Sequence, residues 1–275
     1  MKKTAFKPEV LHLPPSYRKL ARSLKEKKAR DETRLFLAEG EKMVHELLKS
    51  EYRIAWIAAT GGWIREHRHE CAETELYEVD DNLLAGISTL KTPNRVLAVV
   101  YMPESPVRQI PPEADLCLVL DGVQDPGNTG TILRLADWFD IRYVVFGVTS
   151  ADSFNPKTVQ ASMGSIFRVH VIRAEAGTIC RTMRQKGWNI YGMDLQGTNL
   201  YKAALQLPAM IVLGNESRGL SDDIRREVTH FLTIPRGGPG SGAESLNVGM
   251  AAAIVCAEFR RRHPGQAIQN ENSAK

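Results

Sequence analysis

Several signatures of membrane and secreted proteins are missing from this sequence of 275 residues. Its longest apolar run, VGMAAAIVCA at 248–257, is too short to cross a bilayer. The N-terminal stretch MKKTAFKPEVLHLPPS has prolines and charges where a signal peptide would have an apolar segment. We therefore expect a cytoplasmic protein that has no membrane partner.

Cysteine is scarce, and its spacing argues against a metal or redox centre. Cys71, Cys117, Cys180 and Cys256 lie far apart and form no C-x-x-C motif, so we expect reduced thiols. HRHEC at 67–71 offers two histidines and a cysteine at alternate positions, but no matching ligand pair occurs elsewhere. We predict that no metal is bound.

The glycine signatures of nucleotide-binding loops are also absent. LDGVQDPGNTGTILRLADWF at 120–139 runs from an apolar strand into a helix, the usual place for a phosphate-binding loop. Its glycines match neither G-x-G-x-x-G nor G-x-x-x-x-G-K-[ST]. GGPGSG at 237–242 precedes the last helix instead of following the first strand, which argues against a nucleotide-dependent oxidoreductase.

Charge is distributed unevenly along the chain, whose net charge is +4. Residues 1–35 contain eleven Lys and Arg but four acidic residues, a net charge of +7 that leaves −3 for the rest. A basic arm on a near-neutral body indicates a polyanionic partner. A solvated helix face explains the same residues equally well.

Apolar strands alternate with helices in two series. Residues 1–101 are predicted to form a small α/β domain that begins with one charged helix over 17–34. Residues 102–113 contain four prolines and are predicted to be a linker. Residues 114–263 hold six apolar strands between helices, which implies a mostly parallel sheet covered on both faces. The tail, residues 264–275, is predicted to be disordered.

The second series is the one that leads to a candidate site, so its elements matter most. Its strands are predicted at 115–123, 142–148, 167–174, 189–195, 209–216 and 231–236. Its helices are predicted at 129–139, 156–163, 177–187, 221–229 and 245–262.

Three of these strands lead into loops rich in Gly, Asn, Ser and acidic residues. The loops are DGVQDPGNTGTILR (121–134), VLGNESRGLS (212–221) and IPRGGPGSGAESLNVGMAAA (234–253). Ligands bind beyond the carboxyl ends of parallel strands, so the loops together form the candidate site. Taken singly, Asn128 could be a helix N-cap, and Gly214 and Gly219 could be turn residues. Arg134 is different, because the apolar residues around it place it one turn above the first loop.

Together, the three loops resemble the motifs of the SpoU (TrmH-type) branch of the SPOUT RNA methyltransferases. The first motif, an Asn followed six residues later by an Arg, is present here as NTGTILR. The second, an apolar strand ending in Gly-x-Glu, is IVLGNESRGLS, and the third is IPRGGPGSGAESLNVGMAAAI. The resemblance covers residues 114–263. LFLAEGEKMVHELL and KTPNRVLAVV resemble the family's substrate-binding domain.

The resemblance implies transfer of a methyl group from S-adenosylmethionine to a ribose 2′-hydroxyl of RNA. It also implies a trefoil knot around the cofactor pocket and a homodimer with its sites at the subunit interface. By position, the polar catalytic cluster is Asn128, Arg134, Glu216, Ser245 and Asn247. The residues expected to line the cofactor are Leu213, Gly214, Asn215, Ile234, Leu246 and Val248. The loop at 236–244 is longer than is usual in the family.

Arg134 has two conceivable roles in this reading. The family's arginine is regarded as the general base, yet a guanidinium group does not lose its proton in proteins. We prefer Arg134 as an electrostatic stabiliser of the forming alkoxide, bridged to an RNA phosphate, and both roles stay open. Glu216, Ser245 and Asn247 would orient the cluster.

The substrate-binding domain favours ribosomal RNA over transfer RNA as the substrate, and no DNA partner is expected. The candidate phosphate contacts are Lys19, Arg22, Lys25, Lys27, Lys28 and Arg30. A non-catalytic RNA-binding protein of the same fold is the alternative. It predicts loss of the polar cluster, whose members are all present.

Overall fold

The computed structural model describes residues 10–71, 74–92, 94–103, 110–238 and 244–264. Its backbone contacts divide the chain into two compact units. Unit 1 comprises Met1–Glu104 and Phe154–Phe167, and unit 2 comprises Ser105–Ser153 and Arg168–Lys275. A segment from the middle of the second series therefore belongs to unit 1.

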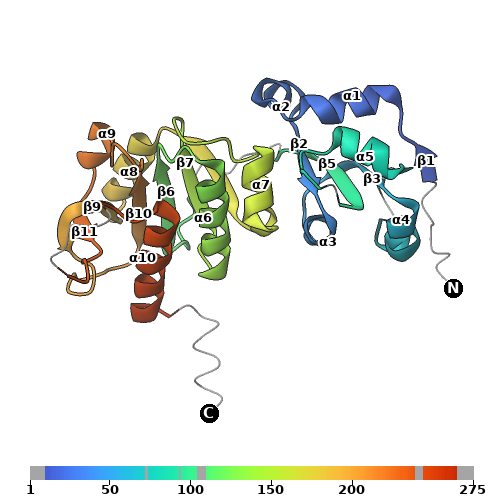
Figure 1. The fold of residues 1–275 in the computed structure, drawn as a ribbon. Helices are drawn as coiled ribbons and strands as arrows, with labels where there is room; N and C mark the ends of the chain where they lie inside the picture. The colour runs from blue at the N-terminus through green and yellow to red at the C-terminus, as the bar shows by residue number, and fades with distance from the viewer. Residues whose placement is uncertain (1–9, 72–73, 93, 104–109, 239–243, 265–275) are drawn as a thin grey trace, which may run out of the picture. The chain divides into compact units, whose positions relative to one another are not determined.

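Unit 1 is a mixed sheet of five strands in the order β1-β4-β3-β5-β2 (Figure 1). The strands are β1 (Val10–His12), β2 (Leu35–Glu39), β3 (Ile54–Ala59), β4 (Leu76–Glu78) and β5 (Val96–Tyr101). The helices are α1 (Pro15–Ser23), α2 (Lys27–Thr33), α3 (Glu41–Leu48), α4 (Gly61–His67), α5 (Asp81–Ile87) and α7 (Pro156–Ser162). Strand β1 was not predicted from the sequence.

The predicted single helix over 17–34 is wrong, because the chain breaks between α1 and α2. Leu24 is fully buried, and Glu26 has an extended backbone. The Arg30 guanidinium, only 1% exposed, donates to the carbonyls of Leu24 at 2.7 Å and Lys25 at 2.8 Å. Arg30 thus satisfies carbonyls that the end of α1 leaves unpaired, and the prediction that it contacts phosphate is wrong.

An aromatic cluster holds residues 154–167 in unit 1. Phe36 of β2 lies against Phe154 with ring centroids 4.7 Å apart, and Tyr52 packs edge-on against Phe167. Tyr52 also donates from its hydroxyl to the carbonyl of Ile166 at 3.2 Å. Burial raises the pKa of Tyr52 to about 12. These contacts place α7 beside β2 and α3.

Unit 2 is a six-stranded sheet in the order β11-β9-β10-β6-β7-β8, and every neighbouring pair is parallel. The strands are β6 (Leu116–Asp121), β7 (Tyr143–Gly147), β8 (His170–Ala174), β9 (Asn189–Asn199), β10 (Ala209–Gly214) and β11 (His230–Thr233). All six predicted strands are present. The predicted fold, a parallel sheet covered by helices, is confirmed.

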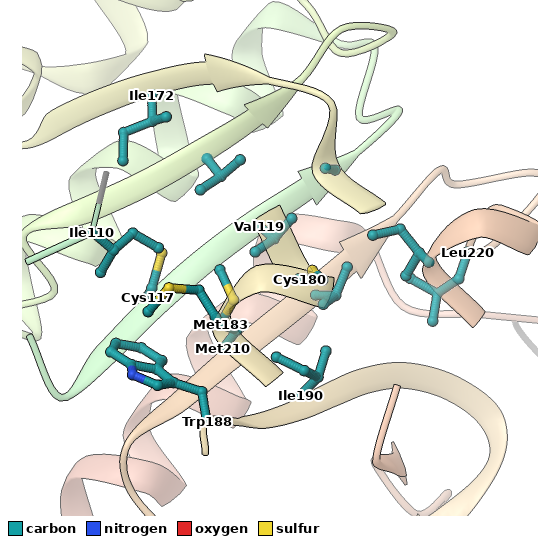
Figure 2. Close-up of a cluster of buried hydrophobic side chains, with 14 residues drawn as sticks. Ile110, Cys117, Val119, Ile172, Cys180, Met183, Trp188, Ile190, Met210 and Leu220 are labelled. Carbon is teal, nitrogen blue, oxygen red and sulfur yellow. The ribbon is translucent and has the colours of Figure 1, made fainter. Parts of the chain in front are cut away.

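Helices cover both faces of this sheet (Figure 1). They are α6 (Pro126–Trp138), α8 (Ala176–Gln185), α9 (Asp222–Arg225) and α10 (Val248–Arg262). Helices α6 and α10 pack together on one face. On the other face, α8 and α9 bury Cys180, Met183 and Ile224 against Val119 and Met210 of the sheet (Figure 2).

Two further findings concern the described part of the chain. None of its helices has the length and apolarity to cross a bilayer, and none of its His, Cys, Asp and Glu residues cluster as metal ligands would. All four cysteines are buried free thiols. Half of the predicted linker and nearly all of the tail lie outside the described residues.

Candidate active site

The three polar loops meet at one edge of the unit 2 sheet. Strands β6, β10 and β11 run parallel, and Gly214 at the end of β10 pairs in register with Asp121 at the end of β6. The loops that follow lead into α6, α9 and α10. The topology therefore brings together segments that lie about a hundred residues apart in the chain.

Asn128 joins the three loops through its side-chain amide. Its Nδ2 donates to Oε1 of Glu216 at 3.1 Å, and its Oδ1 accepts from Nδ2 of Asn247 at 2.9 Å. Each residue comes from a different predicted motif. The structure thus brings three of the five predicted catalytic residues into one hydrogen-bonded chain.

Two helix caps hold the middle residue, Asn128, and one end residue, Asn247, of this hydrogen-bonded chain in place. Asp125, not Asn128, is the N-cap of α6, since its Oδ1 accepts from the backbone N–H of Asn128 at 2.8 Å. Asn247 caps α10, because its Oδ1 accepts from the N–H of Gly249 at 2.9 Å and of Met250 at 3.3 Å. The interpretation of Asn128 as a helix cap is therefore wrong. The side chain of Asn128 instead bonds to Glu216 and Asn247.

The second loop is a tight hairpin fixed by Asn215. The backbones of Asn215 and Gly219 exchange two hydrogen bonds of 2.9 Å. The Asn215 side chain donates to the Gly122 carbonyl at 2.8 Å and accepts from the N–H groups of Ser217 and Arg218. Its side chain therefore ties the second loop to the first.

Gly214 is required by the hairpin itself. A Cβ placed there would lie 2.5 Å from the carbonyl carbon of Gly219 and 2.8 Å from the nitrogen of Leu220. Both are backbone atoms, which cannot move aside as a flexible side chain could. Glycine at position 214 therefore allows two backbone segments of this hairpin to approach each other closely.

Asp121 is a site residue that the sequence reasoning missed. It is 8% exposed, and its Oδ2 accepts from the N–H of Ser221 at 2.6 Å. Its position as an acidic residue at a strand end was the available signal. Asp121 joins the end of β6 to the start of α9.

Arg134 and Ser245 are not joined to the hydrogen-bonded chain. Both are exposed, and within the described residues neither side chain has a hydrogen bond or ion pair. Arg134 shares the outer face of α6 with Thr131 and with Trp138, which is 82% exposed. The Arg134 guanidinium is therefore free to contact a ligand.

The predicted cofactor residues differ widely in exposure. Leu213 and Val248 are buried, Ile234 is half-buried and Leu246 is 50% exposed. Arg236 donates to the carbonyl of Glu244 at 2.7 Å, which closes the base of the long third loop. Residues 239–243 of that loop lie outside the described residues.

Strand β9 contributes an unpredicted bulge beside the third loop. Its pairing with β11 skips residues 193–197, and a Cβ on Gly197 would lie 2.5 Å from the carbonyl carbon of Leu232. Burial alone would raise the pKa of Asp194, but the N–H of Gln196 and the Arg225 guanidinium hold it below its ordinary value. The bulge presents Leu195, which is 67% exposed.

Three more of the predicted phosphate contacts interact with groups of unit 1 itself. Arg22 donates to the Gly86 carbonyl at 2.9 Å, Lys27 pairs with Asp31, and Lys28 lies 3.9 Å from Glu32. Lys25 is exposed and has no ion pair among the described residues.

Comparison with known protein families shows which family has these three loops. Residues 115–257, which include all three loops, match the SpoU rRNA Methylase family. The chain belongs to the SpoU rRNA methylase family. Residues 18–98 match the MRM3-like substrate binding domain, so unit 1 carries the second predicted resemblance as well.

Relatives of this SpoU methylase cover nearly its whole length. The 23S rRNA (guanosine(2553)-2′-O)-methyltransferase RlmP of Bacillus subtilis is 32% identical over 87% of this chain and 94% of its own. A solved TrmH-family structure from Porphyromonas gingivalis is 41% identical, with a TM-score of 0.80, over 91% of this chain and 99% of that one.

A third relative was solved with the cofactor. The rRNA methyltransferase of Sinorhizobium meliloti, bound to S-adenosylmethionine, has a TM-score of 0.83 and 29% identity over 94% of this chain and 100% of its own. The family predicted from the sequence is confirmed, and with it the class of RNA methyltransferase that uses S-adenosylmethionine.

Proposed function

We propose that this SpoU methylase transfers a methyl group from S-adenosylmethionine to a ribose 2′-hydroxyl of ribosomal RNA. The observation that carries the proposal is the hydrogen-bonded chain Glu216–Asn128–Asn247, because it joins one residue from each of the three family loops. Two features favour ribosomal over transfer RNA: the substrate-binding domain in unit 1 and the 23S rRNA relative. Action on ribosomal RNA would place the protein in the cytoplasm.

The residues present fit the cofactor. The backbone of Gly214 and Asn215 lies at the end of β10, and the half-buried Ile234 and the exposed Leu246 follow β11, two positions away in the same parallel sheet. Together they offer backbone polar groups and apolar surface. Leu213 and Val248 would contribute through their backbones, since their side chains are buried. Bound there, S-adenosylmethionine would supply an activated methyl group on a sulfonium.

The chain's own residues would act mainly by positioning and by charge. Arg134 is free and cationic, so it would bind a phosphate next to the target ribose and stabilise the negative charge that develops on the 2′-oxygen. The Glu216–Asn128–Asn247 chain and Ser245 would orient the ribose. An electrostatic role for Arg134 needs no loss of its proton, which is why we prefer it over that of general base.

We also propose that the protein is a homodimer. The outer side of α10 carries Met250, 60% exposed, and the partly exposed Ala253 and Ile254, and α6 carries Trp138, 82% exposed. Apolar side chains exposed on these two packed helices suit a second copy of the chain. The family's knot is proposed too, on the match of residues 115–257 to the SpoU family.

A methyl-transfer assay tests the proposed function. Ribosomal RNA purified from cells without the gene should take up tritiated methyl groups. Mapping of 2′-O-methylated nucleotides before and after the reaction should find one new methylated site. RNA purified from cells with the gene is the control and should take up little. A protein that binds S-adenosylmethionine but methylates neither ribosomal nor transfer RNA would contradict the proposal.

A further inference from the structure

Unit 1 contains a pocket that no part of the methyltransferase site explains. Its cavity volume is about 180 Å³, which is smaller than the usual site for a drug-sized ligand. The side chains that matter for its chemistry are Glu39, Lys42, Met43, Asn94, Gln160 and Met163. All of them lie in unit 1, and the last two come from residues 154–167.

Two amide side chains in this pocket lack partners. Asn94 is exposed and Gln160 is half-buried, and neither side chain has a hydrogen bond within the described part of the chain. A carboxamide offers a donor and an acceptor side by side, the arrangement that pairs with the edge of a nucleobase. Unpaired RNA bases are recognised in this way, by hydrogen bonds at the edge and contacts over the face.

Methionines supply the apolar surface that a base face requires. Met43 is buried at 4% exposure, and Met163 is 36% exposed. A thioether side chain adapts its shape and packs well against aromatic rings. The pocket is therefore apolar at two positions and amide-bearing at two others.

The charged side chains that line the pocket are two carboxylates, Glu39 and Glu41, and the ammonium group of Lys42. Glu39 accepts hydrogen bonds from Ser88 and Thr89, and Oε1 of Glu41 lies 3.6 Å from Nη1 of Arg95. Lys42 is exposed and has no partner among the described residues. A phosphate beside the bound base would meet this ammonium group.

We infer that this pocket binds one unpaired nucleobase of the RNA substrate, read by Asn94 and Gln160 and held between Met43 and Met163. Lys42 contacts the neighbouring phosphate. The inference rests on the proposed function. It assigns substrate recognition to residues 154–167, which the family match places within the methyltransferase sequence, 115–257.

Methyl NMR on the full chain tests the pocket without RNA methylation. The protein is labelled at the methionine methyl groups and titrated with AMP, GMP, CMP, UMP and ribose 5-phosphate. The Met43 and Met163 resonances should shift with at least one nucleotide and not with ribose 5-phosphate. Met183 and Met210, in the core of unit 2, serve as internal references. Absence of a shift, or the same shift with ribose 5-phosphate, would overturn the inference.

Paired variants test the pocket's role in substrate binding. The double variant Asn94→Ala/Gln160→Ala should weaken binding of unmethylated ribosomal RNA about tenfold, the scale of losing amide contacts to one base. Its KM for RNA should rise while kcat, Tm and the Kd for S-adenosylmethionine stay unchanged. Asn82→Ala/Gln185→Ala removes the same groups from exposed helix positions and should change nothing.

The two experiments separate the pocket from the proposed function. If the wild type methylates ribosomal RNA and the double variant keeps its KM, the pocket inference is wrong and the function stands. If the wild type methylates no RNA, the function is wrong, and the NMR titration still decides whether the pocket takes a base.

Discussion

Asn247 uses the two atoms of its side-chain amide for different tasks. Its Oδ1 caps α10, and its Nδ2 donates to Oδ1 of Asn128, which lies 119 residues earlier in the chain. One residue therefore fixes the start of a helix and couples that helix to the first loop. This coupling means that a substitution can separate folding from catalysis.

Asn247→Asp should separate folding from catalysis. An aspartate keeps the oxygen that caps α10 but loses the N–H group that donates to Asn128. We expect a Tm close to that of the wild type and a large loss of kcat, since Asn128 and Glu216 lose their support. Asn247→Ala removes the cap as well and should also cost about 1 kcal/mol of stability. Thermal unfolding and single-turnover methylation of the two variants check this. Equal activity of Asn247→Asp and the wild type would show that the link to Asn128 is dispensable.

Gly214→Ala should disturb the second loop, because the new Cβ would meet the backbone of Gly219 at 2.5 Å. We expect a lower Tm together with weaker binding of S-adenosylmethionine, measured by calorimetry. Gly238→Ala in the third loop is the comparison, since a Cβ there meets nothing within 4 Å among the described residues. A Gly214 variant with unchanged stability and affinity would place the cofactor pocket elsewhere.

The strands could be predicted from the sequence because burial on both faces leaves continuous apolar runs, as in LCLVL of β6. Helix starts could not, because the caps Asp125 and Asn247 are set by local side-chain bonds that several nearby residues could have made. The bond between Asn128 and Glu216 joins residues 88 apart, so only the sheet topology reveals it. Arg30 was misjudged for the same reason: its basic character is visible in the sequence, but its burial is not.

Acid should weaken the end of α10 through Glu258. Hydrogen bonds from Arg261 and Arg262 hold the pKa of this buried carboxyl at about 2, against an ordinary 4.5. A lowered folded-state pKa stabilises the protein above pH 4.5, and this stabilisation is lost as the pH falls toward 2. Glu258→Gln should therefore lower the Tm by a few degrees at pH 7 but much less at pH 3. A constant difference in Tm between these pH values would contradict the ion-pair account.

Salt dependence tests the basic residues of unit 1. Exposed helix pairs such as Lys27–Asp31 are worth about 0.5 kcal/mol or less, so they do not prevent a lysine from turning to a phosphate. Replacing Lys25, Lys27 and Lys28 by Ala should weaken RNA binding at all sequences and lower its slope against log salt by about two. Lys186→Ala/Lys202→Ala is the control at exposed positions in unit 2. An unchanged slope would show that these lysines form only a solvent-exposed surface and do not contact RNA.

Arg134 decides whether the first loop is catalytic. It is exposed, and it has no partner within the described residues, so Arg134→Ala should leave the fold and cofactor binding intact. It should lower single-turnover methylation about a hundredfold or more, the scale of losing one preorganised group that stabilises charge. Arg134→Lys keeps the charge but loses the planar fork that can hold a phosphate and a ribose oxygen together, so it should recover little. The pH profile separates the two roles, because an arginine acting as base would give a rate that rises steeply with pH up to the limit of stability. A wild-type rate in the alanine variant would show that Arg134 has no catalytic role and would contradict the proposed mechanism.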